Sequence, residues 1–183
     1  MWPDLYLMRH GETLWNTQNR MQGGLDSPLT DRGRQQAARQ GALVAEVAGA
    51  RFSSPLGRAV ATAQIVFPGR DFHVDARLAE IGMGVFARHR LDHLRQRHPE
   101  LFTGPPLQFY DRIPGGEGFA ALGARCRAFL EGLSGPSLIV THGITLRMLR
   151  LLAMGQDVDA IARAELWQGA VHVVRNGIEE VWR

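Results

Sequence analysis

Two histidines occupy matching positions in the chain, each between a short apolar run and a glycine. His10 follows the run Asp4–Met8 after one arginine, and His142 directly follows Ser137–Thr141. Apolar runs of this length that end abruptly at polar residues are typical of buried strands. One histidine at a strand end is most often structural. Two at one edge of a sheet favour a functional site, because ligands bind beyond the carboxyl ends of parallel strands.

The chemistry that such a pair supports is nucleophilic attack on phosphorus. Imidazole attacks through an unprotonated ring nitrogen and forms a labile phosphohistidine. The other ring nitrogen must then be oriented by a hydrogen bond, and the backbone around Gly11 offers a carbonyl for it. A phosphoryl group in transfer spreads charge over three equatorial oxygens, and a leaving alkoxide needs a proton. The site therefore needs cations and a carboxylic acid as well.

Two arginines are placed to supply the positive charge. Arg9 is adjacent to His10, and Arg58 comes shortly after the apolar run Ala50–Ser54, so we expect both at the same sheet edge. The planar guanidinium group makes paired hydrogen bonds with phosphate oxygens. Arg58 also begins a predicted helix, and the dipole at a helix N-terminus favours an anion.

The elements that must position these residues alternate between strands and helices. Asn176-Gly177, between two alternating apolar runs, predicts a β-hairpin. The pattern predicts an α/β fold with three layers, α/β/α, a largely parallel central sheet and a C-terminal β-hairpin. Strands are predicted at Asp4–Met8, Ala50–Ser54, Phe72–Val74, Ser137–Thr141, Ala170–Arg175 and Ile178–Trp182.

The predicted helices are amphipathic or follow a strand directly. Thr30 has the character of an N-cap, and small or apolar residues recur at helical spacing from Ala37 to Ala48. Regularity fades between Asp75 and Gly118, where proline and glycine pairs indicate loops. Further helices are predicted at Arg58–Phe67, Leu91–His98, Phe119–Leu133 and Ile144–Met154.

Composition excludes several classes of phosphate-handling protein. All 21 basic residues among the 183 are arginines, so the chain lacks the lysine that P-loops, protein kinases and pyridoxal enzymes require. The net charge of +3 is scattered, which argues against a nucleic-acid partner and leaves weak polyanion binding as an alternative. Cys126 is the single cysteine, which fits a reducing compartment. With no leader-like start and no long apolar segment, we expect a cytoplasmic protein with no membrane partner.

Five motifs in order along the chain resemble those of the histidine phosphatase superfamily, the phosphoglycerate mutase-like proteins, whose fold the predicted elements match. The first and longest is Leu7–Asn16, which reads LMRHGETLWN. Its companions are Leu29–Gly33, Ser53–Ala59, Leu78–Ile81 and Val140–Gly143. The resemblance implies a single domain over residues 1–183, in which residues about 81–118 form a cap-like insertion over the site.

The same resemblance implies a role for each polar residue of the motifs. His10 is the expected nucleophile, and Arg9, Arg58 and His142 are expected to bind the phosphoryl group. Glu80 is the expected acid that protonates the leaving oxygen and then the base that activates water. No cofactor or metal is implied, because the arginines already neutralise the charge.

Four further residues are expected to touch the substrate. Asn16, Gln22 and Gly23 match positions near the phosphate, and Gly143 offers a backbone N–H to the anion. Glu12 is an alternative to Glu80 as the proton donor. His89 and His93, spaced i and i+4 in a predicted helical region, form an alternative metal pair, although no third ligand is evident.

The chain departs from the family pattern only where the cap is expected. Gly84–Ala87 replaces a Gly-Trp-Glu-Gly-like stretch, and Gly118 replaces a serine after Pro114–Glu117. These changes bear on specificity rather than chemistry. The aromatic residues of this segment form either a substrate wall or a core: Phe86, Phe102, Phe109 and Tyr110.

Three functions are consistent with this set of residues. The first is a phosphomonoester hydrolase that acts on a small phosphorylated metabolite through phosphohistidine. The second is a mutase that returns the phosphoryl group to another hydroxyl, which the modest length between Glu80 and Pro114 disfavours. The third is a non-catalytic phospho-ligand binder, which would be expected to have lost a core residue. The natural substrate and the oligomeric state are left open.

Overall fold

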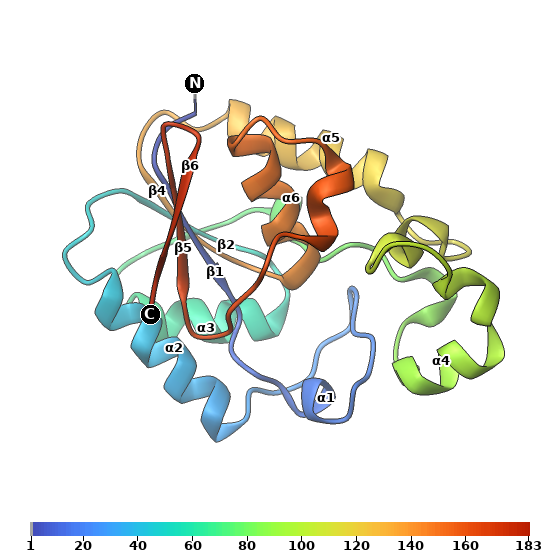
Figure 1. Cartoon of the computed structure of the whole chain (residues 1–183). Coiled ribbons are helices and arrows are strands. Elements are labelled where there is room, and N and C mark those ends of the chain that lie inside the picture. The colour runs from blue at the N-terminus through green and yellow to red at the C-terminus, as the bar shows by residue number, and fades with distance from the viewer. Residues whose placement is uncertain (1) are drawn as a thin grey trace.

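The computed structural model describes residues 2–183, and its centre is one sheet of six strands in the order β3-β2-β4-β1-β5-β6. The first four of these are parallel, whereas β5 runs antiparallel to both β1 and β6. Figure 1 shows the twisted sheet at the centre of the molecule. The strands are β1 Leu5–Arg9, β2 Ala50–Ser53, β3 His73–Val74, β4 Ser137–Thr141, β5 Val171–Arg175 and β6 Ile178–Trp182.

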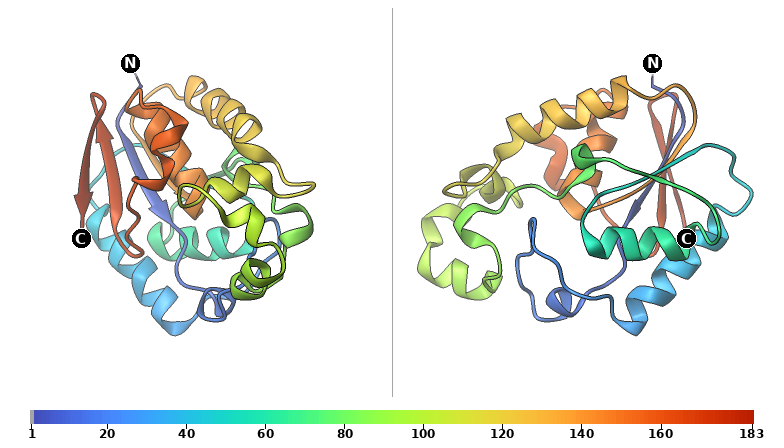
Figure 2. Two further views of the ribbon diagram at one scale, coloured as in Figure 1. Left: turned by 45° about the vertical axis from the view of Figure 1, so that its right-hand side comes forward. Right: turned by 180° about the vertical axis from the view of Figure 1, so that it is seen from behind.

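Helices cover both faces of this sheet, as predicted. Helices α2 and α3 lie on one face, and α5 and α6 lie on the other (Figures 1 and 2). The bounds of the helices are α1 Leu14–Thr17, α2 Asp31–Leu43, α3 Gly57–Val66, α4 Leu91–Arg97, α5 Gly118–Glu131 and α6 Gly143–Ala153. Short 3-10 segments are η1 Ala76–Leu78, η2 Gly84–Phe86, η3 Pro99–Phe102, η4 Gln108–Arg112 and η5 Val158–Ala162.

The two apolar layers arise from the alternation of side chains along β1. Leu5 and Leu7 belong to the core that contains α5 and α6, whereas Tyr6 and Met8 belong to the core that contains α2 and α3. Successive side chains of a strand point to opposite faces, so a strand buried on both faces is apolar throughout. This explains why the sequence run reads as continuously hydrophobic.

The register between β1 and β4 brings the two histidines to one edge. Arg9 pairs with Thr141. His10 and His142, the next residues in each strand's chain, therefore leave the sheet at the same edge. The backbone N–H of His10 donates to the carbonyl of Thr141 at 2.9 Å. In β2, the N–H of Ser54 likewise donates to the carbonyl of Val140 at 3.0 Å. Three strand ends therefore converge where the sequence predicted a site.

The C-terminal hairpin forms as predicted, whereas the helix after Thr30 is shorter than predicted. The hairpin prediction is confirmed, because Asn176 and Gly177 have φ of 50° and 75°, as a two-residue primed turn requires. The helix that begins after Thr30 ends earlier than its apolar spacing predicts: α2 stops at Leu43, and Ala45 and Ala48 lie beyond it. The chain turns there to begin β2 at Ala50, and tertiary packing overrides local propensity.

The segment between β3 and α5 is held by its own aromatic residues. Phe86 and Phe109 are buried, and the rings of Phe102 and Phe109 lie 4.6 Å apart. These aromatic residues were predicted to form either a substrate wall or a core, and Phe86 and Phe109 belong to the core. The segment projects beyond the sheet, to the right in Figure 1. Within residues 2–183, no helix is long and apolar enough to cross a membrane.

Candidate functional site

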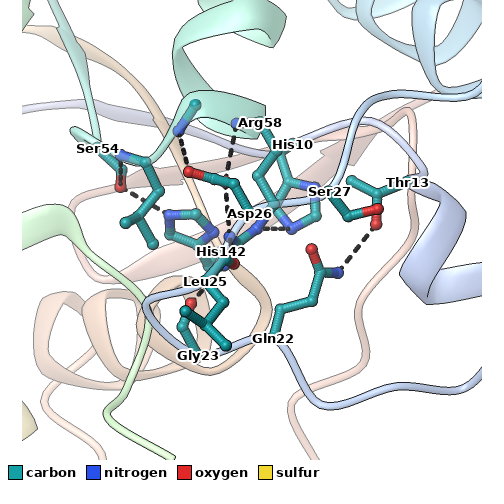
Figure 3. Close-up of polar contacts among 12 residues, drawn as sticks. His10, Thr13, Gln22, Gly23, Leu25, Asp26, Ser27, Ser54, Arg58 and His142 are labelled. Carbon is teal, nitrogen blue, oxygen red and sulfur yellow. Dashed lines mark hydrogen bonds and ion pairs between the residues drawn. The ribbon is translucent and has the colours of Figure 1, made fainter. Parts of the chain in front are cut away.

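His10 is buried at the end of β1 and both of its ring nitrogens are engaged, one of them by Arg58, as Figure 3 shows. Nδ1 lies 2.8 Å from the carbonyl oxygen of Gly11, which only accepts hydrogen bonds, so Nδ1 carries the proton. Nε2 accepts from Nε of Arg58 at 3.2 Å, so its lone pair is free of a proton. Burial, followed by the charges of Arg9 and Arg58, lowers the pKa of His10 well below 6.5. The imidazole is therefore neutral, with its lone pair on Nε2.

Arg58 is fixed by the loop that precedes α2. The side chain is only 1% exposed. Its Nη2 donates to the carbonyl of Gly23 at 2.8 Å, and Nη1 donates to the carbonyl of Leu25 at 2.7 Å and to Asp26 Oδ1 at 3.0 Å. This leaves Nε pointing at His10. A guanidinium held by several partners keeps one orientation at little further entropic cost.

Asp26 closes the N-terminus of α3. Its carboxylate accepts from the backbone N–H of Gly57 at 2.7 Å and from that of Arg58 at 3.1 Å. The start of this helix therefore does hold an anion, as its dipole favours, but the anion is a carboxylate of the chain itself, which already satisfies these N–H groups. What reaches the site from α3 is the Arg58 side chain.

His142 lies across from His10 at the end of β4. The two ring centroids are 5.1 Å apart. A hydrogen bond of 2.7 Å joins its Nε2 to Oγ of Ser54, whereas its buried Nδ1 has no partner within residues 2–183. Burial is the main cause that lowers the pKa of His142 well below 6.5, and Arg58 is the next. One imidazole nitrogen is thus held in place and the other is available.

Arg9 brings a second guanidinium to the same place. Its buried Nε has no hydrogen-bond partner among the described residues. Burial lowers the pKa of Arg9, and the negative charge of Glu80 opposes that shift. Arginine stays protonated in proteins. Arg9 therefore contributes a positive charge whose donors the surrounding chain leaves largely unused.

Glu80 is held against the first turn of α6. Its Oε1 accepts from the backbone N–H of Thr145 at 3.2 Å and from the Thr145 hydroxyl at 3.1 Å, and Oε2 accepts from Ile144 N–H at 3.3 Å. The loop that carries Glu80 is tied down from β4, because Thr141 Oγ1 donates to the Leu78 carbonyl at 2.7 Å. The negative charge of Glu80 opposes the lowering of the pKa of both Arg9 and Arg58 by burial, and Glu80 Oε2 and Arg9 Nε each lie 3.7 Å from the place of a Cβ on Gly143.

Glu12, the alternative proton donor, is engaged elsewhere. Its Oε1 accepts from the Thr30 hydroxyl at 2.9 Å, and its Oε2 lies 3.9 Å from Arg32. Both partners belong to the start of α2. This arrangement favours Glu80 over Glu12 as the acid of the site.

The other expected substrate contacts form a chain of hydrogen bonds. Gln22 Nε2 donates to Thr13 Oγ1 at 2.9 Å, and Thr13 forms a capping box with Asn16 at the start of α1. Gln22 Oε1 is buried and unpartnered among residues 2–183. Gly23, at φ 53°, supplies a carbonyl to Arg58. Asn16 therefore connects to this group through Thr13 rather than through the histidines.

Gly143 opens the space between three charged groups. A Cβ built at this position would lie 3.7 Å from each of Arg9 Nε, Glu80 Oε2 and Arg147 Nη1. Arg147 was not singled out from the sequence, although its position one turn after Gly143 on a predicted helix was a usable signal. Asp26 and Ser54 were also missed, and Ser54 lies inside a motif that was recognised.

The alternative metal pair does not share a helix face. His89 lies before α4, which begins at Leu91, whereas His93 lies within it. The predicted helix starts later than the i and i+4 spacing needs. Within residues 2–183, no group of three His, Cys, Asp or Glu side chains is arranged to hold a metal ion.

Comparisons with known proteins identify the family of the chain. The model of the histidine phosphatase superfamily (branch 1) matches residues 5–180. A Salmonella paratyphi C (strain RKS4594) protein named "probable phosphoglycerate mutase GpmB" is 38% identical over 174 residues, which cover 88% of this chain and 80% of that protein.

Solved structures share the whole fold. YhfR from Bacillus stearothermophilus superposes with a TM-score of 0.82 at 35% identity, covering 98% of this chain and 95% of that one. The α-ribazole phosphatase from Shigella flexneri gives a TM-score of 0.82 at 27% identity, covering 98% and 94%. From the motifs, the arrangement of the site and these matches, the chain belongs to branch 1 of the histidine phosphatase superfamily.

Proposed function

We propose that this protein hydrolyses the phosphomonoester of a small metabolite through a phosphohistidine intermediate on His10. The observation that carries the proposal is the neutral, buried imidazole of His10, whose Nε2 lone pair is free of a proton, together with the unpartnered Nε of Arg9 and Nδ1 of His142 at the same strand ends. A nucleophilic lone pair, two guanidinium groups and the carboxyl group of Glu80 are thus available at one edge of the sheet.

The first step is in-line attack of His10 Nε2 on phosphorus. The N–P bond forms as the P–O bond to the alcohol breaks, and Glu80, which takes up a proton with the bound substrate and is then a neutral carboxylic acid, gives that proton to the leaving oxygen. Arg58 Nε exchanges its hydrogen bond with His10 for one with a phosphoryl oxygen. Arg9 and His142 Nδ1 bind the remaining equatorial oxygens, whose charge grows in the transition state.

The second step returns the enzyme to its starting state. Glu80, now a carboxylate, takes a proton from water as the water oxygen attacks phosphorus. The N–P bond breaks, inorganic phosphate leaves, and the electron pair returns to Nε2. Gln22, Gly23, Asn16 and Gly143 are assigned to substrate binding, the first two through the loop that holds Arg58. No metal or cofactor takes part in either step.

The runner-up function is phosphoryl transfer of the mutase type, which the name of the Salmonella protein favours. We infer hydrolysis because residues 81–118, which we assign as a cap, form only one short α-helix and three 3-10 segments between Glu80 and α5. A mutase must keep water from the phosphohistidine, and a larger closing segment serves that purpose.

The direct test is to trap the intermediate. Wild-type protein mixed with ³²P-labelled aryl phosphate and quenched in alkali is expected to retain label, which acid then releases. His10→Ala is expected to retain none and to lose at least about a thousandfold in kcat, since the nucleophile itself is removed. Undiminished turnover by His10→Ala contradicts the mechanism.

Transfer is separated from hydrolysis by adding an acceptor. The phosphoenzyme is allowed to decay in water alone and in water with a diol or glycerate, and inorganic phosphate is measured against the new ester. Hydrolysis predicts inorganic phosphate as the main product in both. A dominant new ester assigns the mutase function instead.

A further inference from the structure

Glu80, the proposed acid, lies on a stretch of chain with little regular structure. We call residues 77–82 the acid segment. Within it, residues 79–82 follow η1 and precede the isolated bridge of Met83, so they belong to no helix or strand. A general acid must stay within hydrogen-bond reach of the oxygen that it protonates, and a displacement of about 1 Å can cost about a hundredfold in rate. The acid segment therefore needs support from elsewhere in the fold.

One ion pair holds this segment at both of its ends. Arg125, in the middle of α5, donates through Nη1 to the Arg77 carbonyl at 2.6 Å. Glu117, the residue before α5, accepts the N–H of Gly82 on Oε2 at 3.0 Å, and its own N–H donates to the Gly82 carbonyl at 3.1 Å. The chain is thus fixed three residues before Glu80 and two residues after it.

The two side chains also hold each other. Arg125 Nε donates to Glu117 Oε1 at 2.5 Å and Nη2 donates to Oε2 at 3.0 Å, which is the bidentate arrangement of a guanidinium and a carboxylate. Burial opposes ionisation of Glu117, but the hydrogen bonds from Arg125 and from the Gly82 N–H lower the pKa of its carboxyl group. All three nitrogens of Arg125 donate to fixed acceptors, so the guanidinium keeps one orientation.

The backbone around this ion pair is closely packed. A Cβ on Gly82 would lie 3.2 Å from Glu117 Cβ and 3.4 Å from its backbone nitrogen. The next residue, Met83, forms an antiparallel bridge with Gly116. Ile81, directly after Glu80, is fully buried in the core that contains α5. The ion pair is therefore built into the fold, unlike the exposed pairs that contribute little to stability.

Neither member of the pair touches the acid itself. Within residues 2–183, no hydrogen bond or ion pair joins Glu80 to Glu117 or to Arg125. Any influence of the pair on the position of the Glu80 carboxyl group must therefore pass through the backbone of the acid segment.

We propose that Glu117 and Arg125 are positioning residues for the proton donor. By fixing the backbone on both sides of Glu80, the pair keeps its carboxyl group at the place where the leaving oxygen needs a proton. The proposal rests on the proposed function, because it takes Glu80 as the acid. It also gives the last residues of the segment assigned as a cap a part in the chemistry, since Glu117 stands at the end of that segment.

The test measures how strongly the rate depends on the leaving group. Each protein is assayed on p-nitrophenyl phosphate, which needs little protonation, and on ethyl phosphate, whose alkoxide needs the acid. Arg125→Gln is expected to raise the ratio of the two kcat/KM values, nitrophenyl over ethyl, by about tenfold to a hundredfold. Both values come from one preparation, so the fraction of folded protein cancels. A merely structural role leaves the ratio unchanged.

A second variant separates position from charge and serves if Arg125→Gln fails to fold. Arg125→Gln removes a positive charge and Glu117→Gln removes a negative one, so an effect of charge through space on Glu80 would move the ratio in opposite directions. Loss of positioning raises it in both, by a smaller factor in Glu117→Gln, which keeps the shape of the side chain. Arg127→Gln is the control, because Arg127 is exposed on α5 and makes no hydrogen bond or ion pair within residues 2–183, and it is expected to keep the wild-type ratio.

A double variant shows whether the effect passes through the acid. Glu80→Gln raises the ratio by itself, and the addition of Glu117→Gln is expected to raise it no further. The positioning role is overturned, while the phosphohistidine mechanism stands, by an unchanged ratio in the single variants, by shifts of opposite sign, by an equal rise in Arg127→Gln or by a further rise in the double variant. If Glu80→Gln leaves the wild-type ratio unchanged, or if no phosphohistidine forms, the proposed function itself fails.

Discussion

The imidazole of His10 is prepared for its chemistry by neighbours that differ in kind. A carbonyl fixes the proton on Nδ1, and Arg58 fixes the direction in which Nε2 points. Both contacts come from residues of the recognised motifs, and the sequence predicted the carbonyl near Gly11 but not the hydrogen bond from Arg58 to His10. The role of Asp26 was not predictable, because it reaches Arg58 across a separation of 32 positions and through backbone N–H groups.

A first prediction concerns Asp26. Asp26→Asn removes the charge that holds Arg58 Nη1 and the start of α3, so Arg58 is expected to lose orientation. We expect kcat/KM on an aryl phosphate to fall by about tenfold to a hundredfold, which corresponds to about 1.5–3 kcal/mol for a charge-assisted hydrogen bond. Asp31→Asn is the matched control, because Asp31 is exposed and pairs only with Arg34. Equal losses in both variants would contradict the positioning role.

A second prediction concerns the proton donor. Glu80→Gln is expected to slow hydrolysis of alkyl phosphates by a factor on the order of 10² to 10⁴, the usual contribution of general acid catalysis, and to slow p-nitrophenyl phosphate much less. The reason is that nitrophenolate leaves without protonation. Rates on a series of leaving groups provide the measurement. A uniform loss across the series would assign the acid elsewhere.

At the scale of elements, strand ends and the hairpin were predictable and helix ends were less so. β1, β4 and the Asn176-Gly177 turn have local signals that act within a few residues. The end of α2 depends on what the chain packs against next, which apolar spacing does not encode. The start of α4 at Leu91 agrees with the predicted helix Leu91–His98, and His89 lies before it, so the i and i+4 spacing of His89 and His93 does not place them on one helix face.

The loop after β1 and the start of α2 cross at van der Waals distance through two glycines. A Cβ on Gly33 would lie 2.1 Å from the carbonyl oxygen of Glu12, and a Cβ on Gly11 would lie 2.2 Å from that of Gly33. Both obstacles are backbone atoms, so no side-chain rotation relieves them. The crossing positions the carbonyl that orients His10.

A third prediction follows from this crossing. Gly33→Ala is expected to lower the free energy of unfolding by about 1–3 kcal/mol, as overpacking does, and also to lower kcat by displacing the Gly11 carbonyl. Gly135→Ala is the control, because a Cβ there meets nothing within 4 Å. Chemical denaturation and initial rates on both variants check the prediction. A Gly33→Ala protein as stable as Gly135→Ala would show that the loop yields freely.

At the scale of the whole molecule, the burial of two neutral histidines at the site lowers the free energy of unfolding at acidic pH. Burial lowers the pKa of both His10 and His142 well below 6.5. An unfolded chain therefore binds protons at these histidines near pH 6.5, and the folded chain does not. Since stability rises with pH wherever the unfolded state binds more protons, both groups destabilise the fold as pH falls through 6.5.

The fourth prediction states this as a titration. The free energy of unfolding, measured by urea denaturation from pH 8 to pH 5, is expected to decrease progressively as pH drops below about 6.5. His10→Ala removes one contributing group and is expected to flatten the decrease. A wild-type stability that is constant or rises over this interval would contradict the neutral state of the buried pair.

The location of the protein in the cytoplasm stays a prediction from composition.

The hydrogen bond from Arg58 to the His10 lone pair also has a protective consequence. An exposed neutral imidazole is open to alkylation, which would inactivate the enzyme permanently. Here the reactive nitrogen is occupied by a donor, and a ligand able to accept the same N–H displaces it readily. Anionic phosphoryl oxygens are strong acceptors of this kind, whereas alkyl halides and similar alkylating agents are weak ones. The contact that orients the nucleophile thus also restricts its reactivity to substrates of the right chemistry.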